Sequence, residues 1–163
     1  MKRVTSRTSW TAAVILLLAA CGCTGQVHNP NGPKAPAAAV SPRHRWRATG
    51  DLRSPGAAID GTINTAAVSG VSYPGAALTI DLGEMCLLNT VVIDQGADPK
   101  NFPREVTVLT SEDGKIFLRR WEGPGTRRIT NAVLFTPILA RYVRLQATVP
   151  SDRPWSIAEV YLQ

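Results

Sequence analysis

The sequence predicts an all-β fold, an antiparallel β-sandwich, from three observations. Short runs rich in apolar and β-branched residues recur from Trp46 to the end of the chain, and Gly, Pro, Asn and Asp separate them. Within residues 78–82 apolar and polar residues alternate, which is the pattern of a half-buried strand. No stretch sustains the period of about 3.6 residues that marks an amphipathic helix.

The expected strands follow one another along the chain. They lie at 78–82, 87–93, 106–108, 117–121, 129–135, 140–149 and 155–162. Asp113-Gly114 separates two of these runs and is a typical hairpin turn, because both residues tolerate positive φ. Seven or eight short strands with turn signals between them indicate a sandwich.

The charge of the chain argues against a nucleic-acid partner. The formal net charge is +6, but six of the 18 basic residues precede Trp46 while all 12 acidic residues follow it. The expected domain, residues 46–163, is therefore neutral. A nucleic-acid-binding domain concentrates cations on its folded surface, so we expect none here.

The first 20 residues predict a secretory signal peptide. A basic start precedes an apolar run at 11–20, which is too short to span a bilayer. Leu18-Ala19-Ala20-Cys21 resembles a bacterial lipobox, in which Cys21 becomes the lipid-modified first residue. We therefore expect an exported protein that is lipid-anchored to the bacterial cell envelope, at the outer membrane or the cell surface. The alternative is ordinary cleavage with Cys21 left as a free thiol.

Residues 21–45 predict a flexible tether, since Pro, Gly, Asn and Ala dominate and no strand or helix period is present. Cys23 lies in this segment, and Cys86 lies between two expected strands. One interpretation is a Cys23–Cys86 disulfide. The other is that Cys86 is a small buried apolar residue.

Five motifs together resemble one known family. They are Ala-Ala-Ile-Asp-Gly at 57–61, Leu-Thr-Ile-Asp-Leu-Gly at 78–83, Phe-Pro-Arg-Glu-Val-Thr-Val at 102–108, Ser-Glu-Asp-Gly at 111–114, and a C-terminal pair, Ala-Arg-Tyr-Val-Arg-Leu at 140–145 with Ser-Ile-Ala-Glu-Val at 156–160. Their order and spacing are similar to those of the discoidin domain, also called the coagulation factor 5/8 type C domain. Bacterial galactose-binding-like carbohydrate modules share this pattern. The resemblance implies a discoidin-like jelly roll.

The resemblance also implies a structural calcium site between the first loop and the last strand. Asp60 and Glu159 would supply carboxylates, and Thr65 and the carbonyl of Ala158 would complete the shell. Thr62 stands where the family commonly has a second acidic or amide residue, which weakens the site. The alternative is that Asp60 begins an Asx-turn and Glu159 accepts hydrogen bonds from backbone amides of the same loop.

In this family, ligands bind at loops at one end of the sandwich. The resemblance and the residue types there point to a ligand set of Tyr73, Asp98, Asn101, Arg104, Arg153 and Trp155. Phe102 has the alternative role of closing the end of the sandwich, and Trp155 that of a core residue. The family often has a Trp where Ala66-Ala67 follow the first loop, so the usual aromatic floor is missing.

We expect no catalytic residues. Both histidines, His28 and His44, fall in the expected tether, so a histidine-dependent triad or zinc site cannot form in the domain. Asp94, Asp98 and Glu105 are close in sequence, but turns and strand surfaces usually carry solvated carboxylates. The expected function is therefore a non-catalytic carbohydrate-binding module. The alternative is a module that contacts a protein of the cell envelope.

Overall fold

The computed structural model describes residues 40–70, 75–98 and 100–163. It contains eight strands and two short 3₁₀ helices among these residues, which confirms the all-β prediction. The strands are β1 (Arg47–Gly50), β2 (Ala67–Val68), β3 (Ala77–Asp94), β4 (Glu105–Ser111), β5 (Leu118–Pro124), β6 (Ile129–Ala147), β7 (Ser156–Ile157) and β8 (Glu159–Leu162); the helices are η1 (Arg43–Arg45) and η2 (Pro55–Ala58).

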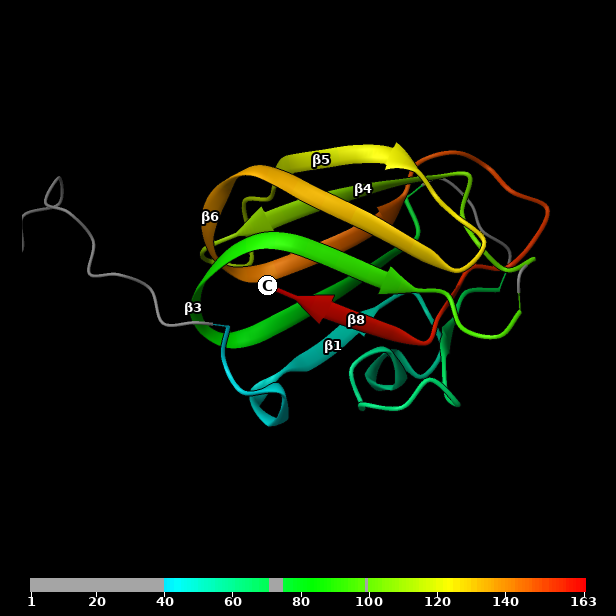
Figure 1. Ribbon diagram of the computed structural model, residues 1–163, viewed down its shortest axis with the longest axis horizontal. Helices are drawn as coiled ribbons and strands as arrows, with labels where there is room; N and C mark the ends of the chain where they lie inside the picture. The colour runs from blue at the N-terminus through cyan, green and yellow to red at the C-terminus, as the bar shows by residue number, and fades with distance from the viewer. Residues whose placement is uncertain (1–39, 71–74, 99) are drawn as a thin grey trace, which may run out of the picture. The chain divides into compact units, whose positions relative to one another are not determined.

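Two long, bent strands, β3 and β6, run through both layers of the sandwich (Figure 1). The first part of β3 lies between β1 and the end of β6, whereas its last part lies between the start of β6 and β8. Their pairing shifts register between Asp81 and Cys86, where Gly83 adopts φ 80°. A positive φ of this kind is accessible to glycine without strain, so the strand can turn from one layer into the other.

This continuity differs from the four separate strands that we expected at 78–82, 87–93, 129–135 and 140–149. The polar residues and the single proline, Pro137, between these runs interrupt the alternation of the sequence, but they do not end the backbone pairing. Leu87 still pairs with Leu139, and Leu88 with Ile138. The strands therefore bend rather than stop.

The six-stranded sheet has the order β1-β3-β6-β4-β5, with β8 paired to the last part of β3, and β2 and β7 form a separate two-stranded sheet. Alternate residues of the long strands point inward, as the two-residue period predicts. The buried core includes Leu78, Ile80, Leu82, Val91, Ile93, Val106, Val108, Val143, Leu145, Ile157 and Val160. Cys86 is also fully buried, which agrees with the interpretation of Cys86 as a small buried apolar residue. Cys23 lies outside the described residues.

The β4–β5 connection is a hairpin, as predicted, but residues 112–117 form a longer turn than a two-residue loop. Only Gly114 has positive φ in it, at 75°. The Asp113 carboxylate accepts hydrogen bonds from the Lys115 and Ile116 amides and the Ser111 hydroxyl. The amide of Lys115 contributes most to lowering the pKa of Asp113 to about 2.

The folded domain begins before Trp46, which corrects the expected boundary of the tether. Ser41 is buried, and its hydroxyl donates to the carbonyl of Leu82 at 2.6 Å. Residues 43–45 form η1, and the exposed His44 belongs to it. The proline-rich composition concealed this anchoring, because the contacts are made by single side chains with distant strands. The remainder of the expected tether and the signal peptide lie outside the described residues.

Where the structure describes the chain, no helix combines the length and apolar character needed to cross a membrane.

Candidate functional site

Three loops meet at the end of the sandwich where β3 ends and β4 begins, at the right in Figure 1. They are residues 95–104, 125–128 and 148–155. Together they form a hollow of about 370 Å³, which we call the cationic hollow. Its lining residues are Lys100, Phe102, Arg104, Arg127, Ser151, Asp152 and Arg153.

The backbone holds these loops against one another. The carbonyl of Asn101 accepts a hydrogen bond from the Ser156 amide at 2.9 Å, which joins the first loop to β7. The amide of Gly125 donates to the carbonyl of Arg104 at 3.1 Å, which joins the second loop to the first. A Cβ at Gly125 would lie 2.0 Å from the carbonyl oxygen of Pro103. Glycine at this position therefore permits the close approach that brings Arg127 to the hollow.

The hollow is electrostatically unbalanced. Four of its lining residues are basic, and one, Asp152, is acidic. The charged ends of Lys100, Arg104, Arg127 and Arg153 make no hydrogen bond or ion pair with another described residue. Arg141, by comparison, forms a bidentate pair with Asp81. The site thus presents guanidinium and ammonium donors that no described residue uses.

A second hollow of about 440 Å³ adjoins the first, because Arg127 lines both. We call it the flanking hollow. Its other lining residues are Ile63, Asn64, Asp94, Gly96, Ala97 and Arg128. The amide of Gln95 donates to the carbonyl of Arg128 at 2.7 Å and fixes the loop between the two hollows. The loop end therefore offers a recognition surface longer than one hollow.

Of the six residues predicted to bind ligand, the structure brings Arg104 and Arg153 together at the cationic hollow. Asp98 and Asn101 belong to the same loop but do not line it; the Asp98 carboxylate accepts a hydrogen bond from the Lys100 amide at 2.9 Å. Tyr73 lies outside the described residues.

The expectation that Trp155 contacts ligand is wrong. Its side chain is 0% exposed, and its indole N–H donates to the Gln95 side-chain oxygen at 3.0 Å. Trp155 immediately precedes β7 and belongs to the hydrophobic core beneath the loops. The aromatic ring at the hollow is instead that of Phe102, which is half-buried and lines it.

The sequence interpretation missed the loop at 125–128 entirely. Arg127 and Arg128 are adjacent basic residues in a turn between two expected strands, and the antiparallel order places that turn at the same end as residues 95–104. These two features together would have predicted that the loop lies at the binding end. Lys100, Ser151 and Asp152 fall in loops that were expected to bind ligand, but they were not in the predicted ligand set, because solvated loop residues of these types are common.

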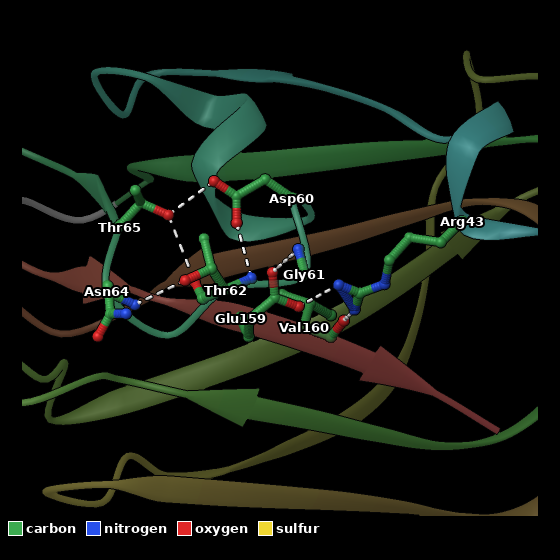
Figure 2. A network of polar contacts seen from close by, with 8 residues as sticks. All are labelled: Arg43, Asp60, Gly61, Thr62, Asn64, Thr65, Glu159 and Val160. Carbon is green, nitrogen blue, oxygen red and sulfur yellow. Dashed lines mark hydrogen bonds and ion pairs between the residues drawn. The ribbon is translucent and has the colours of Figure 1, made fainter.

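The other predicted site lies between the first loop and β8, and Figure 2 shows its polar contacts. The Asp60 carboxylate accepts from the Thr62 amide at 2.9 Å and from the Thr65 hydroxyl at 2.6 Å, which forms an Asx-turn. Glu159 Oε1 accepts from the Gly61 amide at 2.7 Å. The predicted proximity of Glu159 to the Asp60 turn is therefore confirmed.

Arg43 reaches this site from η1 and completes it (Figure 2). Its guanidinium forms an ion pair with Glu159 Oε2 and donates to the carbonyl of Val160. It also lies 5.0 Å from the centre of the Trp46 ring and 5.3 Å from that of Tyr161. A cation between two rings and a carboxylate is held by charge and by cation–π attraction together.

The residues as arranged do not fit a calcium ion. Each of the four oxygens of Asp60 and Glu159 already accepts a donor, and the Arg43 guanidinium places a positive charge beside Glu159. Ala158 is buried, and its amide donates to the carbonyl of Asp94. No group of three or more His, Cys, Asp or Glu side chains within the described residues is placed to hold a metal.

The pKa values of the two carboxyls differ in direction. Burial raises the pKa of Glu159 above its ordinary value, while the Gly61 amide and Arg43 act against this rise. Hydrogen bonds from Thr65 and Thr62 lower the pKa of Asp60. Arg43 therefore supplies the counter-charge that the buried carboxylate needs when it is ionised.

Comparisons with known proteins agree with this architecture. Residues 36–160 match the model of the F5/8 type C domain. No curated protein sequence matches the chain. Among solved structures, the family 32 carbohydrate-binding module of Clostridium perfringens NanJ, in complex with galactose, is 21% identical with a TM-score of 0.66 and covers 74% of this chain and 95% of its own.

Two other modules are similar. CpGH89CBM32-5 from Clostridium perfringens, in complex with GalNAc-β-1,3-galactose, is 24% identical with a TM-score of 0.65, over 77% of this chain and 99% of its own. The CBM32 of AlyQ, in complex with 4,5-unsaturated mannuronic acid, is 22% identical with a TM-score of 0.59, over 72% of this chain and 92% of its own. At these identities the likeness concerns the fold. The family match covers most of the chain, and the chain therefore belongs to the F5/8 type C, or discoidin, domain family.

Proposed function

We propose that this domain is a non-catalytic module that binds carbohydrate at the loop end of the sandwich. The observation that carries the proposal is the cationic hollow, in which the half-buried ring of Phe102 lies among basic side chains whose donors have no partner among the described residues. A sugar presents C–H groups to an aromatic face and hydroxyls to polar neighbours, so one apolar surface with polar groups around it suits a saccharide.

Two further points support a binding role rather than catalysis. The structurally similar modules named above were solved in complex with galactose, with GalNAc-β-1,3-galactose and with an unsaturated mannuronic acid. In the described residues, the one histidine, His44, is exposed on η1 and does not line the hollow. The hollow therefore offers positioning groups and no imidazole base.

A glycan array followed by affinity gel electrophoresis tests the proposal. The protein is expected to bind at least one class of glycan, and Phe102→Ala is expected to weaken that binding about three- to ten-fold, from the loss of stacking. Phe135→Ala is the matched control, because Phe135 is 100% exposed on β6 and does not line the hollow. Thermal melting checks that both variants fold.

Failure to bind any glycan by the folded protein would overturn the proposal. Capture of one envelope protein, unaffected by Phe102→Ala and by added sugars, would instead support the protein-contact role that the sequence left open.

We also propose that the domain is exported and held at the cell envelope by lipid on Cys21, which precedes the described residues. The sequence motif at 18–21 supports this. Several acyl chains at about 0.8 kcal/mol per buried methylene would hold the protein at a membrane. Mass spectrometry of the N-terminal peptide from the native host is expected to show an acylated Cys21, and an unmodified peptide would contradict the anchor.

A further inference from the structure

We propose that the glycan bound by this domain is anionic, and that its carboxylate or sulfate groups are held by the arginines of the cationic hollow. This inference rests on the proposed function and narrows it to one class of ligand. The reason lies in how charge is distributed over the domain.

The folded part of the chain from Ser41 onward has 14 basic and 12 acidic residues, yet its charges are not evenly spread. Four basic residues and one acidic residue line the cationic hollow, and Arg128 adds another cation in the flanking hollow. Asp94 in the flanking hollow is buried, and its carboxylate already accepts from the Gly96 amide at 2.8 Å. An excess of positive charge therefore faces solvent at the binding end.

Close cations without counter-charges repel one another, and an anionic ligand relieves that repulsion. Arg104, Arg127 and Arg153 have no acidic partner among the described residues, unlike Arg43 with Glu159 and Arg141 with Asp81. Other arginines in that part of the chain, such as Arg47 and Arg53, also lack an acidic partner, but at the cationic hollow four basic residues line one space with a single acidic residue. An anionic ligand would supply the negative charge that balances the basic residues of the hollow.

The kind of cation also matters. Three of the four are arginines, and a planar guanidinium with two parallel donors matches a carboxylate or a sulfate better than it matches single hydroxyls. Phe102 supplies the ring face that a bare inorganic anion would not need. Because Arg127 lines both hollows, a chain of acidic sugars can contact the same arginine from two neighbouring units.

A structural neighbour shows that this fold can bind such a ligand. The CBM32 of AlyQ was solved with 4,5-unsaturated mannuronic acid, a sugar acid. Two other neighbours were solved with the neutral sugars galactose and GalNAc-β-1,3-galactose, so the fold alone does not decide between a neutral and an acidic ligand. In this chain, the excess of basic residues at the hollow favours an acidic sugar as the ligand.

Calorimetric titration with paired ligands tests the inference. Oligogalacturonate is compared with its methyl ester, which keeps the sugar ring and removes the charge, and sulfated dextran is compared with unmodified dextran. At least one charged member is expected to bind ten-fold or more tightly than its neutral partner, with affinity falling as salt rises. The preferred pair identifies the anion as carboxylate or sulfate.

Charge-removal variants locate the effect. Arg127→Gln and Arg153→Gln are each expected to weaken binding of the acidic ligand about ten-fold, the loss expected for one charge-assisted contact. Lys115→Gln is the matched control, because Lys115 is an exposed residue of the β4–β5 connection, which lies at the opposite end of the sandwich from the hollow (Figure 1). It is expected to leave affinity unchanged.

The outcomes separate the two proposals. If a neutral galactan binds and the arginine variants bind it as well as the natural chain does, the module binds sugar but this inference is wrong. If neither neutral nor acidic glycans bind, the proposed function itself fails. If duplex DNA of equal charge binds as tightly as the acidic glycan, the hollow is a general polyanion surface and the inference is overturned.

Discussion

Arg43 is the residue whose role differs most from what its sequence neighbourhood suggests. It lies in a proline-rich segment, yet its guanidinium neutralises Glu159, whose side chain is 1% exposed. An ionised carboxylate buried without a counter-charge is costly, so the pair contributes chiefly by preventing that cost. Trp46 and Tyr161 hold the guanidinium on either side.

Replacing Arg43 is therefore expected to destabilise the domain in a pH-dependent way. Burial already raises the pKa of Glu159, and Arg43→Met removes a group that opposes the rise. A carboxyl whose pKa is higher in the folded than in the unfolded protein contributes its full stabilisation below the unfolded pKa. That stabilisation is lost as the pH rises through the folded pKa. We expect a loss of about 2–4 kcal/mol at pH 7 and a smaller loss near pH 4, measured by urea unfolding.

Arg45→Met is the control for that measurement. Arg45 pairs with Glu84 at the surface, where such a pair contributes no more than about 1 kcal/mol. An equal loss for both variants, or a loss at Arg43 that does not change with pH, would contradict the role given to the buried pair. Calcium is expected to leave the melting temperature of the natural chain unchanged; a rise would show that the Asp60 loop binds the ion after all.

At the level of elements, the binding end depends on how closely the 125–128 loop approaches the loop before β4. Gly125→Ala would place a methyl group 2.0 Å from the carbonyl oxygen of Pro103. The loop must then move, and Arg127 with it. We expect weaker glycan binding together with a modest loss of stability, about 1–3 kcal/mol.

Gly56→Ala tests whether that effect is specific. Gly56 lies in η2 with nothing within 4 Å of the added Cβ, so this variant is expected to keep both affinity and stability. Glycan affinity that survives Gly125→Ala in a folded protein would show that the position of this loop does not matter for binding.

The start of the domain provides the next prediction. A chain beginning at Trp46 lacks Ser41, which donates to the carbonyl of Leu82, and Arg43, which supplies the positive charge beside Glu159. We expect it to melt well below a chain that begins at Lys34, or to remain unfolded. Equal melting temperatures in differential scanning calorimetry would place residues 40–45 outside the cooperative unit.

The sequence predicted where strands form and which faces they bury, but it did not predict which strands continue across a bend. The two-residue alternation at 78–82 and 143–147 is a local property, so it identified strands and their buried faces correctly. Whether β3 and β6 continue across a bend depends on backbone pairing with a distant partner, which no local pattern records. Arg43 and Trp155 illustrate the same limit, since their roles are decided by residues more than fifty positions away.

Across the whole molecule, the family's motifs predicted the architecture, because each belongs to a strand or turn that the sandwich requires. They predicted the binding end less well. The motifs concern the scaffold, whereas the loops at 95–104, 125–128 and 148–155 vary in length and charge without disturbing it. The cationic character of the hollow emerged only when the fold brought three separate loops together.

Amide chemical-shift mapping during titration with a glycan retained on the array would locate the bound ligand on the molecule. The binding role proposed here predicts that the largest changes fall at residues 100–104, 125–128 and 151–153, around the cationic hollow. Changes confined to the β4–β5 hairpin or to the exposed face around Phe135, with none at the loop end, would contradict it.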